Sequence, residues 1–236
     1  AEQQSPWVIV ELSEGAQQGF QPYGGGLKLW KCKAPEVVIS GPAETGKTRT
    51  ALEKFDTLMW KYPRSQAIII RKTFKSLKTS VLLTFEHKFL GAWNDEGTTL
   101  IRDDSGRVIV TLKGAFDQRK TPVVKVGGEH VEGYIYPNGS RIYLGGMDTP
   151  EKVLSSEWDV VYVNQAEELT LNDWEIISTR TTGRAGNMPY AQMLADCNPS
   201  FPTHWIRARA ATGRLKFIES RHEDNPTLYN QVTHQI

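Results

Sequence analysis

The chain has 236 residues and a formal net charge of +1, and 23% of its residues are charged. This length can bury the core of a full α/β domain, whereas the near-neutral charge excludes a polyanion-binding character for the whole chain, so any nucleic-acid surface must be local. Two distant cysteines, Cys32 and Cys197, favour a reducing cytosol over a disulfide framework, and no apolar run reaches the roughly 20 residues that a membrane span needs.

The first 36 residues carry weak structural signals. Residues 7–10, Trp-Val-Ile-Val, are compatible with a strand, and the three consecutive glycines at 24–26 predict a flexible break or a tight turn. We therefore treat residues 1–36 as an N-terminal segment that precedes the first core strand.

Residues 41–48, Gly-Pro-Ala-Glu-Thr-Gly-Lys-Thr, fit the phosphate-binding pattern G-x-x-x-x-G-K-[ST] and are called the P-loop. The β-branched run at 37–40 before it is typical of a buried parallel strand. Residues after it recur at helical spacing on one apolar face: Ala51, Leu52, Phe55, Leu58, Met59 and Tyr62. Strand, glycine loop and helix are the context in which this pattern binds a nucleoside triphosphate.

The residue types of the P-loop match the chemistry of phosphate binding. Gly41 and Gly46 let the backbone curl until successive N–H groups point at phosphate oxygens, and the following helix adds its positive end. We expect Lys47 to reach the β- and γ-phosphates of ATP and the Thr48 hydroxyl to hold Mg²⁺. The other predicted nucleotide-binding residues are Pro42, Ala43, Glu44, Thr45 and Arg49.

Gln21 and Tyr23 lie just upstream of the first core strand, where P-loop motors often build an adenine pocket. The alternative is an ordinary surface loop, because Gly-rich connections are usually exposed.

Residues 67–70 predict a second buried strand, and a helix from about 75 to 93 follows it. This is the most basic part of the chain, with Arg71, Lys72, Lys75, Lys78 and Lys88. A solvated helix face is the common explanation of such a charge run, and contact with DNA or another phosphate is the alternative.

Over residues 98–147 the continuous apolar runs give way to alternating apolar and polar residues. This pattern predicts antiparallel strands that are added to, or inserted into, a parallel core. Apolar and polar residues alternate over 98–102, 107–112, 131–136 and 141–144, and Asn138-Gly139 is a strong hairpin signal between the last two runs. The charged segment 113–125 predicts a mobile loop.

The parallel core resumes with a third buried strand at 159–163. Helices at 171–181 and 203–211 then alternate with strands at 193–195 and 215–219. Strands alternating with helices after a P-loop predict an α/β fold, a parallel sheet flanked by helices, with ligands at the carboxyl ends of the strands.

The third strand ends in Asn164-Gln165-Ala166-Glu167-Glu168. P-loop ATPases place acidic residues here, one that binds Mg²⁺, often through water, and a next one that polarises the attacking water. This chain has amides at both positions, and a neutral amide accepts no proton. In one hypothesis Asn164 holds the Mg²⁺ water shell and Gln165, natural or engineered, replaces the catalytic Glu and impairs hydrolysis. In the other hypothesis the catalytic base lies elsewhere, and Glu167 and Glu168 are the next candidates for it.

These motifs resemble the N-terminal ATPase domain of bacteriophage large terminase subunits, the motors that pump DNA into capsids. The resemblance is carried by residues 40–48, by 70–74 with 77–80, by 145–152 leading into 158–169, and by 196–199 with 224–226, in the family's order. It implies a P-loop NTPase core of the additional-strand type with added antiparallel strands, as one ATPase domain over 1–236. We expect no C-terminal RNase H-like nuclease domain, because the chain ends at Ile236.

The resemblance also implies site residues and partners. Asn198 would belong to the motif that senses the γ-phosphate and couples hydrolysis to movement, although Asn-Pro is also a common turn. Many terminases carry an arginine at the position of Ala43, so Arg49, or an arginine finger from a neighbouring subunit, would replace it. The finger candidates are Arg102, Arg141, Arg180 and Arg184.

The implied partners are double-stranded DNA, the portal protein, the small terminase subunit and further copies of the chain in a homo-oligomeric ring on the capsid. The implied location is the cytoplasm of the infected bacterial host, without a membrane partner. A helicase or translocase of similar core is the alternative enzyme, and a non-hydrolysing nucleotide-binding assembly module is the alternative outside enzymes.

Overall fold

The computed structural model describes residues 20–102, 105–127 and 131–225, and its centre is an eight-stranded sheet of order β10-β1-β9-β8-β2-β7-β6-β5. The first six strands in this order run parallel to their neighbours, and β6 and β5 add an antiparallel edge. The bounds are β1 Glu36–Ser40, β2 Gln66–Arg71, β5 Val124–Val126, β6 Gly133–Ile135, β7 Arg141–Gly146, β8 Val160–Val163, β9 Gln192–Cys197 and β10 Lys216–Glu219.

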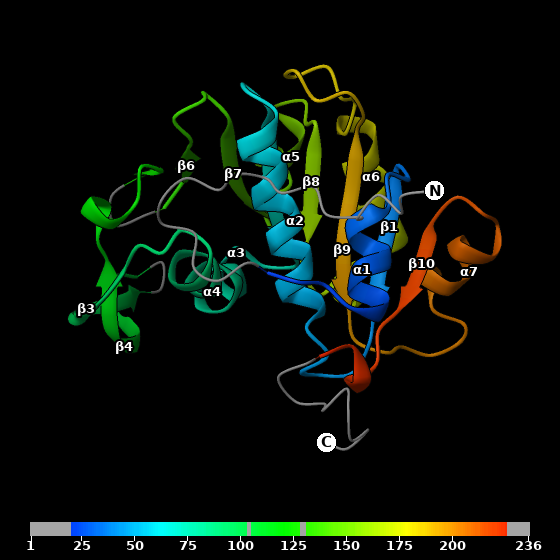
Figure 1. Ribbon diagram of the computed structural model, residues 1–236, viewed down its shortest axis with the longest axis horizontal. Helices are drawn as coiled ribbons and strands as arrows, with labels where there is room; N and C mark the ends of the chain where they lie inside the picture. The colour runs from blue at the N-terminus through cyan, green and yellow to red at the C-terminus, as the bar shows by residue number, and fades with distance from the viewer. Residues whose placement is uncertain (1–19, 103–104, 128–130, 226–236) are drawn as a thin grey trace, which may run out of the picture.

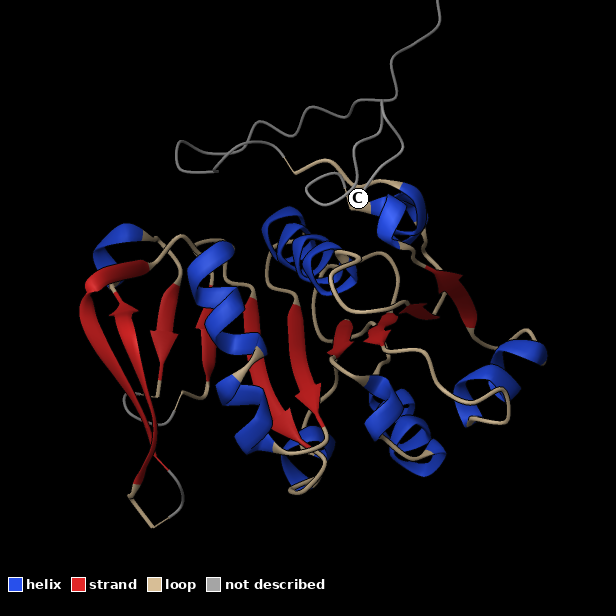
Figure 2. Ribbon diagram, turned by 90° about the horizontal axis from the view of Figure 1, so that it is seen from below, coloured by secondary structure: helices blue, strands red, loops and turns tan. Residues whose placement is uncertain are grey.

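Helices cover both faces of this sheet (Figure 1, Figure 2). The first four helices, α1 Gly24–Lys31, α2 Lys47–Lys61, α3 Phe74–Thr79 and α4 Val81–Lys88, contribute to one core. The other core includes α5 Glu151–Leu154, α6 Leu171–Arg180 and α7 Trp205–Ala211. Successive strand residues face opposite sides, so Val37 packs in the first core and Val38 in the second.

The predicted α/β fold of the additional-strand type is confirmed, because β9 separates the P-loop strand β1 from β8. The predicted antiparallel character of 98–147 is wrong for β7, which pairs in parallel with β2 and antiparallel with β6. Alternating residues fit either orientation, so the pattern could not show that β7 belongs to the parallel core. β3 Trp93–Arg102 and β4 Val108–Phe116 form a separate two-stranded sheet.

Three local predictions are also corrected. The glycines at 24–26 begin α1 rather than a flexible break: a Cβ on Gly25 would lie 2.3 Å from the Glu219 carbonyl oxygen, so these glycines allow close packing. The helix expected over 75–93 is two helices that meet at Ser80. The loop expected at 113–125 contains the end of β4, the short helix η1 Gln118–Lys120 and the start of β5. The strand considered at 7–10 lies outside the described residues.

Candidate nucleotide-binding site

The P-loop joins β1 to α2 and lies at the foot of α2 in Figure 1. Glu44 and Gly46 have left-handed backbones, with φ of 66° and 80°, which curl the loop. Lys47 Nζ donates to the Pro42 carbonyl oxygen at 2.9 Å, and the Thr45 hydroxyl donates to the same oxygen at 3.1 Å. The loop therefore has a curled conformation typical of phosphate-binding loops, and the Lys47 side chain is folded back on a carbonyl oxygen of the same loop.

Neighbouring strands hold the P-loop in place. A Cβ on Gly41 would lie 2.5 Å from the Ser220 carbonyl oxygen, so only glycine permits this approach to the end of β10. The Gly41 N–H donates to the Cys197 carbonyl oxygen of β9 at 3.3 Å, and Asn225 Nδ2 donates to the Glu44 carbonyl oxygen at 2.6 Å. These contacts pre-organise the loop before any phosphate arrives.

Asp196, at the end of β9, is the buried acid of this site, with 1% of its surface exposed. It accepts hydrogen bonds from the Thr48 hydroxyl, from the Tyr162 hydroxyl at 3.0 Å, from Asn164 Nδ2 at 3.1 Å and from the Gln165 N–H at 2.9 Å. Burial, together with the Asp196 carboxylate, raises the pKa of Tyr162 well above its ordinary value. The sequence analysis did not identify Asp196 as a site residue. An Asp that directly follows the apolar run 193–195, near the carboxyl end of a strand, is a signal that could have indicated it.

Thr48 and Asp196 are the donor pair that fits Mg²⁺, because hydroxyl and carboxylate oxygens are the ligands that this cation prefers. Asn164 donates its amide hydrogens to Asp196 and so helps to hold the carboxylate, and its expected role in the Mg²⁺ water shell stays a prediction. No three His, Cys, Asp or Glu side chains among the described residues group into a metal site. A cation here would need phosphate or water oxygens to complete its ligands.

Gln165 points toward β2, which lies on the far side of β8 from the P-loop strand. Its backbone is left-handed, with φ of 55°, and its Oε1 accepts from Arg71 Nη2. Arg71 is itself fixed, because Nη1 donates to the Ser76 carbonyl oxygen at 3.1 Å and to the Ser80 hydroxyl at 2.6 Å. The amide side chain is therefore held away from the β1 side of the sheet.

Glu167 and Asn198 contact each other between β8 and β9. Glu167 lies on the short helix η2 Ala166–Glu168, and its Oε1 accepts from the Asn198 N–H at 3.0 Å and from Asn198 Nδ2 at 2.8 Å. Burial raises the pKa of Glu167 above its ordinary value, although the Asn198 N–H groups act in the opposite direction. Glu168 is exposed and lies 3.5 Å from Arg71 Nη2.

The predicted arginines do not gather at the P-loop. Arg49 Nε donates to Glu53 at 2.8 Å and its guanidinium lies 4.9 Å from the centre of the Phe89 ring. Arg141 begins β7, the Arg180 carbonyl accepts from the Trp158 N–H just before β8, and Arg184 pairs with Glu157 at 2.8 Å. These three lie toward the amino ends of the parallel strands, opposite the P-loop. Arg102 ends β3 in the separate sheet.

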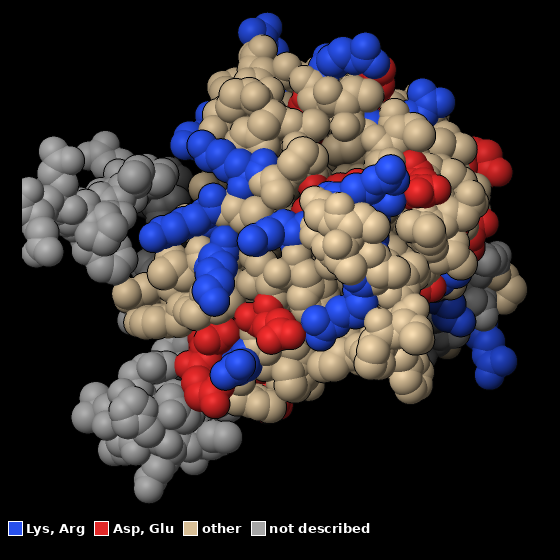
Figure 3. Space-filling model, turned by 90° about the vertical axis from the view of Figure 1, so that its right-hand side faces the viewer, with Lys and Arg blue, Asp and Glu red and all other residues tan. Residues whose placement is uncertain are grey.

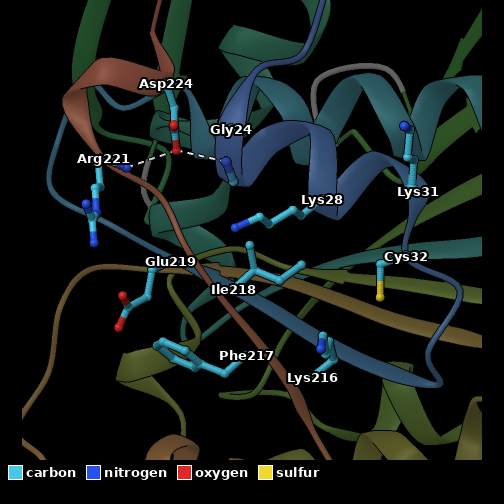
Figure 4. A pocket seen from close by; sticks show the side chains of 11 residues that line it. Gly24, Lys28, Lys31, Cys32, Lys216, Phe217, Ile218, Glu219, Arg221 and Asp224 are labelled. Atoms are coloured by element: carbon cyan, nitrogen blue, oxygen red, sulfur yellow. Dashed lines mark hydrogen bonds between the residues drawn. The ribbon is translucent and has the colours of Figure 1, made fainter. Parts of the chain in front are cut away.

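Gln21 and Tyr23 lead into α1, which packs on the first turn of α2: a Cβ on Gly26 would lie 2.9 Å from Thr50 Oγ1. An adenine contact from these residues stays a prediction. A groove of about 1030 Å³ lies between α1 and the edge strand β10 (Figure 4). Its lining includes Lys28, Lys31, Lys216 and Arg221, and Figure 3 shows several basic side chains on this side of the molecule.

Comparison with known proteins finds similarity in structure alone. No protein-family model matches the chain, and no curated protein matches its sequence. The large terminase of a thermophilic bacteriophage superposes with a TM-score of 0.61 and 13% identity, over 90% of this chain and 49% of that one. The same protein in complex with ATP-gamma-S superposes with a TM-score of 0.58, and its complex with ADP superposes with a TM-score of 0.57. Each match has 13% identity and covers 90% of this chain and 48% of the other.

The chain therefore shares the fold of about half of the thermophilic phage large terminase, which agrees with the resemblance found in the sequence, and it spans about half the length of that protein. None of the helices in the described part of the chain has both the length and the apolar composition that crossing a membrane would require.

Proposed function

We propose that this chain is the ATPase motor domain of a viral large terminase, which hydrolyses ATP to move double-stranded DNA into a procapsid. The observation that carries the proposal is the position of the curled P-loop beside Asp196, with Thr48 bonded to that carboxylate, in a terminase-type fold. The complexes of the thermophilic phage terminase with ADP and ATP-gamma-S support a nucleotide as the ligand.

Different residues of the site would bind different parts of the nucleotide and its cation. Backbone N–H groups of the P-loop and the first turn of α2 would bind the phosphates, and Lys47 would exchange the Pro42 carbonyl oxygen for the β- and γ-phosphates. Thr48 and Asp196 would hold Mg²⁺. When bound, this cation would neutralise negative charge on the phosphates.

Other parts of the proposal concern the assembled motor. Duplex DNA, a portal protein, a small terminase subunit and a ring of further copies would be the partners, in the cytoplasm of the infected bacterium. An arginine from a neighbouring copy would complete the site, because the Arg49 side chain forms an ion pair with Glu53. Asn198, which contacts Glu167 beside the P-loop, would report the state of the nucleotide to the rest of the domain.

We expect the chain to bind a fluorescent ATP analogue in the presence of Mg²⁺, and linear duplex DNA to raise its ATPase rate more than single-stranded DNA of the same length does. A motor that contacts a duplex responds to duplex geometry, whereas a helicase core of the same type acts on single strands. Binding is measured by fluorescence titration and hydrolysis by phosphate release. Stronger stimulation by single strands would favour the helicase alternative, and absence of analogue binding would overturn the proposal.

A further inference from the structure

Glu167 suits the role of general base better than Gln165, the residue at the position where the family has its catalytic Glu. We propose that Glu167 is the catalytic base of ATP hydrolysis in this chain, and that Asn198 is the positioning residue that holds its carboxylate. The inference rests on the proposed function and identifies which group of this site accepts the proton.

The first observation is the asymmetric environment of the Glu167 carboxylate. Two N–H donors of Asn198 hold Oε1, at 3.0 and 2.8 Å. Oε2 is buried and has no hydrogen-bond partner among the described residues. A buried polar atom without a partner is uncommon and calls for an explanation. No water-sized probe reaches Oε2 in this structure, so a shift of its surroundings on nucleotide binding must admit the water molecule. Because no protein donor occupies Oε2, it could then accept a hydrogen bond from that water, as a general base must.

The second observation is where the two candidate side chains point. Asn198 follows β9, the strand next to the P-loop strand β1, and the preceding residue Cys197 accepts a hydrogen bond from the Gly41 N–H. Contact with Asn198 therefore places Glu167 on the P-loop side of β8. Gln165 is bonded to Arg71 at the end of β2, on the opposite side of β8.

The third observation is chemical. Glu167 can accept a proton, whereas the amide of Gln165 cannot. Burial raises the pKa of Glu167, and the nearby Asp196 carboxylate adds to this effect, so the group is a stronger base than an exposed glutamate. Glu168 is one residue away in the same short helix, but it is exposed and its carboxylate lies against Arg71.

The proposed step conserves atoms and charge. The oxygen of a water molecule forms a bond to the γ-phosphorus while the bond between that phosphorus and the β–γ bridging oxygen breaks. The bridging oxygen leaves with ADP, one proton of the water moves to Glu167 Oε2, and inorganic phosphate is the second product. Glu167 then releases the proton to solvent.

Three single variants test this step: Glu167→Gln, Glu168→Gln as the matched control from the same turn, and Gln165→Glu. We expect Glu167→Gln to slow single-turnover hydrolysis at saturating ATP and Mg²⁺ by about 10²–10⁴-fold, the usual effect of losing a positioned general base. Its affinity for a non-hydrolysable ATP analogue should stay unchanged, because the P-loop contacts are intact. Glu168→Gln should match the original chain. Gln165→Glu should gain little, because a carboxylate at 165 would pair with Arg71.

Asn198 is tested by a double-mutant cycle. Asn198→Ala should slow hydrolysis without lowering analogue affinity, and it should have no further effect in the Glu167→Gln background, because it acts through that carboxylate. If the role of Asn198 were merely structural, Asn198→Ala would instead lower the thermal midpoint of unfolding. It would also slow hydrolysis by the same factor in the original chain and in the Glu167→Gln variant.

The outcomes separate the inference from the proposed function. Equal rates for Glu167→Gln and the original chain overturn the inference, as does a large gain in Gln165→Glu from a chain that otherwise binds ATP without hydrolysing it. The second result would establish the hypothesis that Gln165 replaces the catalytic Glu. Failure of the original chain to bind the analogue would overturn the proposed function, and the inference with it.

Discussion

Replacing Lys47 by alanine should lower the affinity for an ATP analogue by about 100-fold or more and so remove measurable binding. Lys47 is expected to contact both the β- and the γ-phosphate, and each hydrogen bond to a charged group contributes about 1.5–3 kcal/mol. The two bonds together are therefore about 3–6 kcal/mol, and each factor of ten in affinity is about 1.4 kcal/mol. Lys47 is the cation that the P-loop itself positions, since its Nζ already lies on the Pro42 carbonyl oxygen. Isothermal titration with the analogue and Mg²⁺ measures the effect.

The matched control for this variant is Lys61→Ala, which removes an exposed lysine from the last turn of the same helix. Its affinity should equal that of the original chain. If Lys47→Ala bound the ATP analogue as tightly as the original chain does, the 41–48 loop would not be the site that binds the phosphates.

Replacing Asp196 by asparagine should lower the single-turnover hydrolysis rate by at least about 100-fold, or about 2.7 kcal/mol of barrier. The carboxylate is the buried negative charge beside the Thr48 hydroxyl, and an amide would hold a divalent cation more weakly. The Mg²⁺ concentration that gives half-maximal ATP binding should rise at least about tenfold, within the range found when groups around metal sites are lost. A Mg²⁺ titration at fixed ATP measures this shift.

The Asp196 variant needs a control for stability, because it leaves buried donors without an acceptor and each costs about 1–3 kcal/mol. Tyr162→Phe removes one donor to Asp196 and keeps the carboxylate. It should lower the thermal midpoint of unfolding while the Mg²⁺ dependence stays normal. The same Mg²⁺ dependence in Asp196→Asn and in the original chain would contradict a cation held by Asp196.

Much of the parallel core was predictable because its sequence signals are local. β1, β2 and β8 are short runs of apolar residues with polar neighbours, and the P-loop pattern fixes the strand–loop–helix unit around β1. The orientation of β7 was not predictable, because its partner β2 lies 75 residues earlier in the chain (Gln66 pairs with Arg141) and alternation does not specify parallel pairing. The glycines before β1 were misjudged, since they permit packing of α1 on Glu219 and Thr50 rather than a turn.

The candidate site was predictable where one motif contains it and not where separate strands form it. Lys47 and Thr48 follow from the P-loop pattern alone. The contact of Thr48 with Asp196 depends on β9 lying between β1 and β8, a fact of strand order. The contact of Glu167 with Asn198 also joins segments thirty-one residues apart. The left-handed backbone of Gln165, which sends its side chain toward Arg71, has no signature in the residue pattern.

A crystal structure of the chain with ATP-gamma-S and Mg²⁺ tests the assignment of the nucleotide site most directly. We expect the triphosphate on the backbone of residues 41–48, with Lys47 moved from the Pro42 carbonyl oxygen to the phosphates. We also expect the cation between Thr48 and Asp196, and Glu167 Oε2 facing the γ-phosphate across a water molecule. A nucleotide bound elsewhere, for example in the basic groove between α1 and β10, with an unchanged P-loop, would contradict this assignment.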